Sequence, residues 1–190
     1  FRTYPEFSTH YPLLLTTIMK RPVRMYPNET GVVYRNPATW EYFRFTWMQW
    51  YLRVAQLTNG LSSELKARAG APGEPGDRIA TMALNTHRHL ELYYGVTGIG
   101  ATLHPINVRL SPQHIVYTIR HAGDKILFVD DTLMPLLEGI YDQIRDVVET
   151  VVYMSDKPGL PQTRIPGIIE YETLLARQAD TFDWPALHED

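Results

Sequence analysis

Residues 94–110, YGVTGIGATLHPINVRL, contain three glycines whose spacing, read backwards, resembles that of a dinucleotide-binding loop that cradles phosphate. Such a loop needs its glycines directly after a strand and at the start of a helix, where free backbone N–H groups meet the anion. Here the order is reversed, because Gly95, Gly98 and Gly100 fall in the second half of a predicted helix that leads into a strand. We therefore interpret them as small residues that let this helix pack closely on a sheet.

The preceding residues NTHRHLELYYG raise the possibility of a metal site. On a helix, His87 and His89 point about 200° apart and cannot share one ion, whereas His87 and Glu91 are one turn apart and could. The sequence places no third ligand beside them. Polar side chains at the surface, or at the edge of a cleft, are therefore the favoured interpretation of all three residues.

Two carboxylates, Asp130 and Asp131, end a short apolar segment that predicts a buried parallel strand. Open α/β sheets bind ligands at the carboxyl ends of their strands, so these side chains are candidates for a ligand contact. Capping of the turn that follows the strand is the simpler role, and it is the one we favour.

Nucleophilic catalysis finds little support in the sequence. The serines beyond the N-terminal segment are Ser62, Ser63, Ser111 and Ser155, and none lies in a nucleophile-elbow pattern. Ser111 precedes Pro112 and is better placed as a helix cap. The P-loop pattern GxxxxGK[ST] is also absent from the chain. The residues alone therefore predict no assembled active site.

The elements that would position these residues begin with a helix, a hairpin and a second helix. Residues 12–27 predict a short helix that ends near Pro22, or near Pro27 if Pro22 only kinks it. Residues 31–35 and 41–45 predict the two strands of a hairpin. Thr46 and Gln49 form a capping box for a long helix. Its apolar face recurs at steps of three and four residues: Trp47, Trp50, Tyr51, Val54, Leu57, Leu61 and Leu65.

From residue 78 onward, predicted strands and helices alternate. The strands are 78–84, 101–106, 125–130 and 147–154, and the helices are 86–100, 111–123 and 133–145, followed by a loop and a short helix at 168–178. Asn85 or Thr86 caps the first of these helices, and Gly123 ends the second. This order predicts an α/β fold: an N-terminal β-hairpin, then a mostly parallel, doubly wound sheet covered on both faces.

Composition excludes several function classes. The net charge of −3, from 18 basic and 21 acidic residues, gives no electrostatic reason to expect nucleic acid or an anionic membrane as partner. The absence of cysteine excludes disulfides and thiolate catalysis. No apolar run reaches the roughly 18 residues of a transmembrane segment. We expect a cytoplasmic protein whose natural N-terminus precedes Phe1.

Taken in order, these segments resemble the adenylate-forming acyl-CoA synthetases. Residues 31–61 resemble the opening hairpin and threonine-capped helix of that family. Residues 73–130 resemble its next block, with GDRIA, the PIN turn, LSPQ and the strand KILFVD standing where the family has GDRVA, P-x-N, L(S/T)P-E and K-x-(L/I)-(F/V)-x-D. The resemblance covers about residues 11–190, and the start, residues 12–35, looks most like medium- and long-chain fatty acid–CoA ligases.

The resemblance also implies that part of the enzyme lies outside this chain. In the family, the phosphate-binding loop TSGTTGxPKG follows shortly after an acidic W-x-x-L-x-E segment. Residues 182–190, FDWPALHED, match that segment, and no phosphate loop is present. We therefore expect residues 1–190 to be the N-terminal portion of the large adenylate-forming domain, inactive alone, with the catalytic residues beyond it.

By resemblance, the parent enzyme uses ATP and Mg²⁺ to convert a fatty acid to an acyl-adenylate and pyrophosphate, then transfers the acyl group to CoA. None of these molecules is expected to bind tightly to the 190 residues alone. In related synthetases the turn before SP lies near the nucleotide end of CoA, which here is Asn107, Val108 and Arg109. Arg109 would then meet a phosphate; the alternative is a surface turn with a solvated arginine.

A function of another class stays open on the sequence. The chain could be a free-standing α/β binding module without catalytic activity. It could also serve mainly as an interaction module, since some members of the family dimerise through N-terminal regions, so a homodimer is among the expected assemblies.

Overall fold

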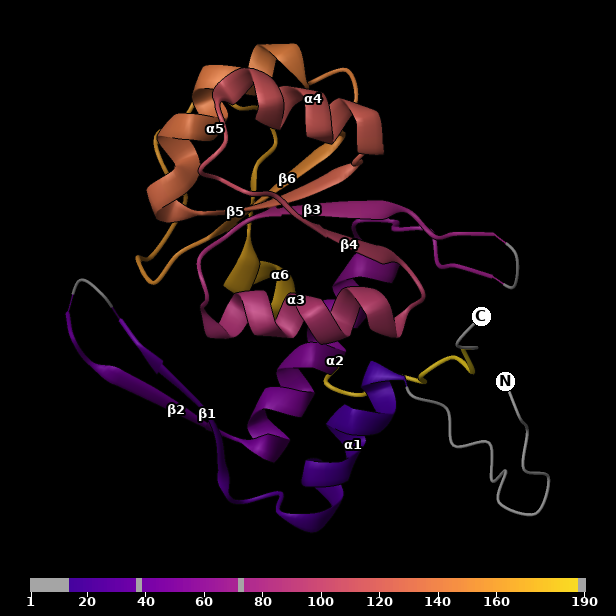
Figure 1. Ribbon diagram of the computed structural model, residues 1–190. Coiled ribbons are helices and arrows are strands. Elements are labelled where there is room, and N and C mark those ends of the chain that lie inside the picture. Colours follow the sequence, from indigo (N-terminus) through magenta and orange to yellow (C-terminus); the bar gives the residue numbers. More distant parts are fainter. Residues whose placement is uncertain (1–13, 37–38, 72–73, 188–190) are drawn as a thin grey trace.

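The computed structural model describes residues 14–36, 39–71 and 74–187. The described chain begins with α1 (Leu15–Met25) and an antiparallel hairpin of β1 (Thr30–Arg35) and β2 (Tyr42–Thr46). Helix α2 (Trp47–Ser63) follows β2 without a loop. In Figure 1 the hairpin extends away from the main body, and α1 lies beside α2. The hairpin prediction is therefore confirmed.

The remaining strands form one parallel sheet of five strands. They are β3 (Arg78–Met82), β4 (Thr102–Pro105), β5 (Ile126–Asp130), β6 (Thr150–Met154) and β7 (Ile169–Glu170). Their order across the sheet is β4-β3-β5-β6-β7, and every neighbouring pair is parallel. The first strand of this sheet, β3, therefore lies in its interior, and later strands are added on both sides of it. This is the doubly wound arrangement that the alternation of elements predicted.

Helices cover both faces of this sheet (Figure 1). On one face lie α2, α3 (His87–Gly98) and α6 (Tyr171–Ala176), and on the other lie α4 (Pro112–Ala122) and α5 (Met134–Ile140). Strand β5 serves both faces, because Ile126 and Phe128 belong to the first cluster, whereas Leu127 and Val129 belong to the second. This is the two-residue alternation of a strand buried on both sides.

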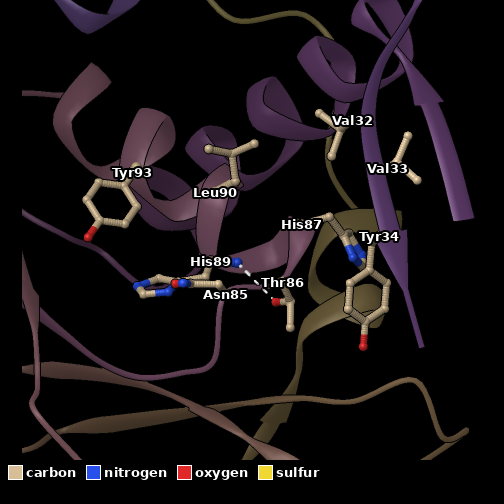
Figure 2. A pocket seen from close by; sticks show the side chains of 9 residues that line it. All are labelled: Val32, Val33, Tyr34, Asn85, Thr86, His87, His89, Leu90 and Tyr93. Atoms are coloured by element: carbon tan, nitrogen blue, oxygen red, sulfur yellow. Dashed lines mark hydrogen bonds between the residues drawn. The ribbon is translucent and has the colours of Figure 1, made fainter. Parts of the chain in front are cut away.

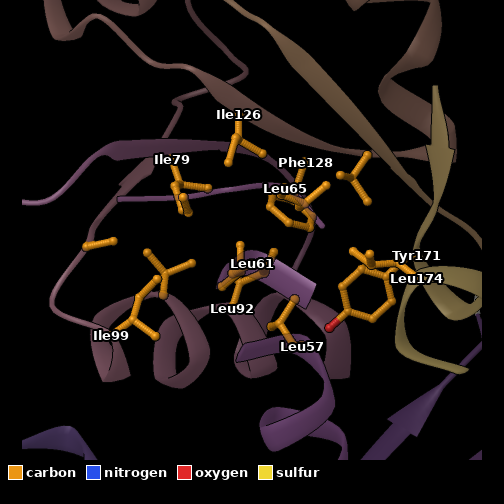
Figure 3. Close-up of a cluster of buried hydrophobic side chains, with 14 of the residues drawn as sticks. Leu57, Leu61, Leu65, Ile79, Leu92, Ile99, Ile126, Phe128, Tyr171 and Leu174 are labelled. Carbon is orange, nitrogen blue, oxygen red and sulfur yellow. The ribbon is translucent and has the colours of Figure 1, made fainter. Parts of the chain in front are cut away.

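The first of these clusters joins helices that are distant in sequence. Figure 3 shows Leu57 and Leu61 of α2 and Leu92 of α3 beneath side chains of the sheet, with Tyr171 of α6 at one end. All four side chains are completely buried. Burial of a large apolar side chain contributes roughly 1.5–3 kcal/mol, so this contact fixes α3 against the sheet.

The predicted helix ends are confirmed where their signals are local. Thr46 and Gln49 make both bonds of the capping box at the start of α2. Thr86 caps α3 and Ser111 caps α4, each by accepting the N–H of the residue three positions later. Gly123 ends α4 with φ of 67°, a backbone conformation that a side chain disfavours.

Helix α1 continues through Pro22 to Met25, in agreement with the second of its two predicted ends, near Pro27. The carbonyl that loses its partner at Pro22 belongs to the exposed Ile18 and can bind water. Two other elements differ from the prediction. The predicted helix 133–145 is split, with short 3₁₀ segments on either side of α5. Residues 169–170 pair with β6 before α6 begins, so the predicted helix 168–178 was too long.

The three glycines of residues 94–110 pack, but not against the sheet as predicted. A Cβ on Gly95 would stand 2.8 Å from Leu57 of α2, and one on Gly98 would stand 2.5 Å from Trp184. Gly100 has φ of 76° and lies against the backbone of Gly70. The glycines therefore allow α3 to approach another helix and the C-terminal segment, and they form no phosphate cradle.

Candidate functional site

The turn predicted to lie near CoA follows β4 and directly precedes α4. Asn107 Oδ1 accepts the backbone N–H of Arg109 at 3.1 Å, which closes a turn of the Asx type. Val108 is half-buried and packs on the apolar cluster beneath α4, whereas Asn107 and Arg109 are exposed. The turn is therefore anchored at its centre and presents its two polar side chains outward.

The Arg109 side chain makes no hydrogen bond or ion pair with any described residue, so its guanidinium is available to a ligand. It also lies two residues before Ser111, the N-cap of α4. The partial positive charge of a helix N-terminus favours anions. The turn is therefore chemically suited to a phosphate group; its proximity to CoA stays a prediction.

A separate pocket of about 270 Å³ lies between β1 and the first turns of α3 (Figure 2). Val32, Val33, Leu90 and Tyr93 make its lining largely apolar. Polar groups come from the loop before α3 and from its first turn: Asn85, Thr86, His87 and His89. None of the lining residues comes from the turn 107–109, so these two candidate regions are distinct.

The two histidines of the pocket are buried, not surface residues. His87 is 5% exposed and its ring lies 5.0 Å from that of Tyr34 and 5.1 Å from that of Phe45. Burial, reinforced by the charge of Arg88, lowers the pKa of His87 to about 3, so its imidazole is neutral. Its Nδ1 atom is buried and has no hydrogen-bond partner among the residues that the structure describes.

His89 contacts the sheet instead. Its Nε2 atom lies 3.2 Å from Oγ1 of Thr81 on β3, and burial lowers the pKa of its imidazole. Both histidines line the pocket, so the cleft-edge interpretation is confirmed for them and the surface interpretation is wrong. As neutral rings they can pack against a ligand or form one hydrogen bond with it, but they carry no charge near neutral pH.

Glu91 does not line the pocket and is completely buried, so the surface and cleft-edge interpretations are both wrong for this residue. Arg53 of α2 donates from Nε to its Oε1 at 2.6 Å, and the hydroxyl of Tyr171 donates to its Oε2 at 2.7 Å. Both carboxylate oxygens are therefore occupied. The pairing of His87 with Glu91 in a metal site gives way to an ion pair between α2 and α3.

This ion pair continues into a network that holds the pocket walls. Glu172 accepts hydrogen bonds from both Arg53 and Arg88 at 2.7–3.1 Å. Arg88 also donates to Asp156 at 2.8 Å, and Asp156 accepts the hydroxyl hydrogen of Tyr34 at 2.9 Å. The network thereby fixes β1 to α3, the two elements that enclose the pocket.

One residue in the sequence, Arg53, indicated this network, although the apolar periodicity of α2 did not include it. Arg53 lies between Trp50 and Leu57 on the apolar face of α2, where a cation without a partner would be costly. A charge on a buried face indicates a partner on another element. The identity of that partner depends on tertiary contacts that local patterns do not contain.

Neither Asp130 nor Asp131 caps the turn after β5, contrary to the favoured interpretation. The Asp130 carboxylate accepts the backbone N–H of Leu84, which holds the loop between β3 and α3. Asp131 accepts the hydroxyl hydrogen of Tyr153 at 3.1 Å and lies 2.8 Å from Nζ of Lys157. Asp130 therefore joins the carboxyl ends of the neighbouring strands β3 and β5. The sheet continues from β3 to β4 on one side and from β5 to β6 on the other, so these carboxyl ends mark the point where the strand order reverses.

The remaining serine and acidic groups assemble no catalytic or metal centre in the residues that the structure describes. Ser62 and Ser63 donate to carbonyls of their own helix, and Ser155 accepts the N–H of Lys157. Within the described ranges, no group of three or more His, Asp or Glu side chains could hold a metal ion. No helix in those ranges is long and apolar enough to cross a membrane.

Comparison with known proteins gives consistent matches. The chain is 46% identical over 115 residues to the 3-methylmercaptopropionyl-CoA ligase of Ruegeria pomeroyi, which covers 60% of this chain and 21% of that protein. It is 40% identical to the medium-chain-fatty-acid–CoA ligase of Ectopseudomonas oleovorans (67% and 24% covered) and 40% identical to the long-chain-fatty-acid–CoA ligase of Thermus thermophilus (75% and 24% covered). The chain thus spans between a fifth and a quarter of the length of these relatives.

Solved structures share the fold at lower identity. The anthranilate CoA ligase AuaEII in complex with anthranoyl-AMP aligns over 93% of this chain and 30% of its own, with a TM-score of 0.73 and 20% identity. A further structure, described as a long-chain-fatty-acid CoA ligase from Rhodopseudomonas palustris, aligns over 95% of this chain and 40% of its own, with a TM-score of 0.69 and 20% identity. These likenesses confirm the α/β architecture.

The family profile decides the assignment. Residues 19–175 match the family described as AMP-binding enzyme, a span that runs from α1 into α6. The chain belongs to the family of AMP-binding enzymes.

Proposed function

We propose that the chain is the N-terminal part of an ATP-dependent acyl-CoA synthetase whose substrate is a fatty acid. The parent enzyme converts fatty acid, ATP and CoA to acyl-CoA, AMP and pyrophosphate through an acyl-adenylate. The observation that carries this proposal is the 40% identity, over 67–75% of this chain, to ligases of medium- and long-chain fatty acids. The match to the AMP-binding family does not favour a free-standing binding module.

In this proposal the 190 residues build part of the large domain and leave the phosphate chemistry to the rest of the parent enzyme. Adenylation brings a carboxylate against an α-phosphate, so the parent needs cations at the reacting atoms. No three acidic or imidazole side chains among the described residues converge on a point where Mg²⁺ would bind. The described residues therefore offer no cluster of three such side chains for a cation, and we derive no catalytic step through ATP or Mg²⁺.

CoA fits one part of the chain. The turn 107–109 offers a free guanidinium beside a helix N-terminus, which suits a phosphate of the CoA nucleotide. Arg109 would hold that phosphate and so orient the thiol end of CoA toward the acyl group. Its proposed contribution is one of binding.

A chimeric enzyme tests the proposal. The 190-residue chain replaces the matching segment of the Ectopseudomonas oleovorans ligase, and pyrophosphate release is measured with octanoate, ATP and CoA. We expect the chimera to release pyrophosphate, and the 190-residue chain alone to release none. The unmodified ligase is the control.

Because a mismatched interface could unfold the chimera, circular dichroism and thermal melting are compared with those of the unmodified ligase. A second chimera built on the Thermus thermophilus ligase provides an independent scaffold. Two folded chimeras that activate no fatty acid would contradict the assigned function. Turnover by the 190-residue chain alone would instead contradict the proposal that the catalytic groups lie in the rest of the parent enzyme.

The cytoplasmic location and the homodimer expected from the sequence stay predictions. Cell fractionation tests the first, and light scattering of the purified parent enzyme tests the second.

A further inference from the structure

Helix α1 presents three different faces. Successive residues of an α-helix are rotated by 100°, so the direction of each side chain follows from its number. Thr16 and Met19 are buried and Val23 is half-buried, and these three fall within a narrow arc that faces the body of the protein. The two remaining faces of the helix point away from the described chain.

The second face is a basic stripe made of Lys20, Arg21 and Arg24. All three side chains are exposed, and none forms an ion pair with a residue in the described ranges. The ammonium group of Lys20 lies 5.9 Å from the ring centroid of Trp184.

The third face is an apolar stripe, and it lies beside the basic stripe. Ile18 is 54% exposed, Met25 is 53% exposed and Leu15 is 36% exposed. Tyr26, at the residue after the helix, is 54% exposed. Scattered apolar residues are normal on protein surfaces, but here they line one face of a single helix. Figure 1 shows α1 beside α2, at the periphery of the described chain.

We propose that α1 docks on the surface of an anionic lipid bilayer. A helix with a basic face and an adjacent apolar face lies in the membrane interface, where its cations meet lipid headgroups and its apolar side chains enter the acyl region. The net charge of −3 for the whole chain conceals this local stripe, because the acidic residues lie elsewhere. The inference is independent of the proposed catalytic function.

Charge and polarity favour this partner over two others. Nucleic acid would meet the basic stripe but would leave Ile18 and Met25 in water. A second copy of the chain that joined through α1 in a two-fold contact would bring two basic stripes together. A bilayer with anionic headgroups satisfies both faces of the helix at once.

Flotation with lipid vesicles tests the proposal. The 190-residue chain is mixed with vesicles of phosphatidylcholine, either alone or with added phosphatidylserine, and the bound fraction is measured. We expect binding only to the vesicles that contain phosphatidylserine. Each basic residue near an anionic surface changes partitioning about fivefold. The K20Q/R21Q/R24Q variant is therefore expected to bind on the order of a hundredfold more weakly.

A matched control removes three exposed cations elsewhere that form no ion pair with a described residue, in the variant K66Q/R109Q/R145Q, and should bind vesicles as the unchanged chain does. An I18S/M25S variant keeps all cations and should also lose vesicle binding. Equal loss in the control and in the α1 triple variant would overturn the proposal, as would absence of binding to phosphatidylserine vesicles. Binding to duplex DNA that I18S/M25S does not affect, without vesicle binding, would assign the stripe to nucleic acid instead.

Discussion

Arg53 of α2 donates from Nε to Oε1 of Glu91 in α3 across 2.6 Å, and the Glu91 side chain has no exposed surface. Removal of one member of a buried ion pair costs about 3–5 kcal/mol when the other member is left unpaired, and less here, because Arg53 keeps its ion pair with Glu172. Glu91→Leu also leaves the hydroxyl of Tyr171 without its acceptor. We expect this variant to lose about 2–3 kcal/mol of its free energy of unfolding, measured by urea denaturation.

Two further variants show whether the loss comes from this buried network. The double variant Arg53→Met with Glu91→Leu also removes the two hydrogen bonds from Arg53 to Glu172, so it should be less stable than Glu91→Leu alone. Arg120→Met, which breaks the exposed pair with Asp146, should leave the unfolding midpoint almost unchanged. If Glu91→Leu proves as mild as Arg120→Met, the buried pair does not hold α2 to α3.

Two glycines in different helices should respond oppositely to alanine. At Gly95 a Cβ would stand 2.8 Å from Leu57, which is completely buried and cannot move aside. Overpacking of this kind costs about 1–3 kcal/mol and outweighs the gain in helix propensity. At Gly139 in α5 no atom lies within 4 Å of the added Cβ. Gly139→Ala should therefore stabilise the chain by up to about 1 kcal/mol, and thermal melting compares the two variants.

The stability of the chain should depend on pH through Asp130. Burial raises the pKa of this carboxyl from 3.8 to about 6, and the N–H of Leu84 and the charge of Arg88 oppose that rise only in part. A raised folded-state pKa gives a contribution to stability that is complete below pH 4 and is lost as the pH rises through 6. Asp130→Asn removes this titrating carboxyl, but its side chain keeps an oxygen that can accept the N–H of Leu84.

Relative to the unchanged chain, Asp130→Asn should therefore gain stability as the pH rises from 4 to 7. Urea denaturation across that range measures the difference. Asp146→Asn is the control without a slope in this range, because Arg120 lowers the pKa of Asp146 from 3.8 and its contribution is lost only below about pH 4. A constant difference between Asp130→Asn and the unchanged chain from pH 4 to pH 7 would rule out the raised pKa.

Local signals in the sequence predicted much of the fold. Thr46, Ser111 and Gly123 mark helix ends because their effects act within four residues, and the structure confirms each. The alternation of strands and helices was sufficient to predict a parallel sheet covered on both faces. Boundaries failed where tertiary contacts decide them, as at Ile169, which pairs with Val152 of β6 instead of joining α6.

The candidate site was predicted less well, because its contacts are long-range. Arg53 and Glu172 lie 119 residues apart in the chain and meet only in the folded protein. The burial of His87 likewise depends on Tyr34 and Phe45 of the hairpin, which no periodicity within α3 indicates. The fold could thus be inferred from local patterns, whereas the pocket walls require the packing of the hairpin on α3.

The proposed role of Arg109 gives a prediction in the chimeric enzyme. A hydrogen bond to a charged group contributes roughly 1.5–3 kcal/mol, so Arg109→Gln should raise the KM for CoA about tenfold or more. Because the contact is made equally in the ground state and the transition state, kcat and the KM for ATP should stay constant. Arg109→Lys keeps the charge but loses the paired donors, so its KM for CoA should lie between those of the unchanged enzyme and Arg109→Gln. Arg145→Gln, at another exposed position, is the matched control. If Arg109→Gln and Arg145→Gln give the same KM for CoA, the guanidinium of Arg109 lies in solvent and the turn binds no phosphate.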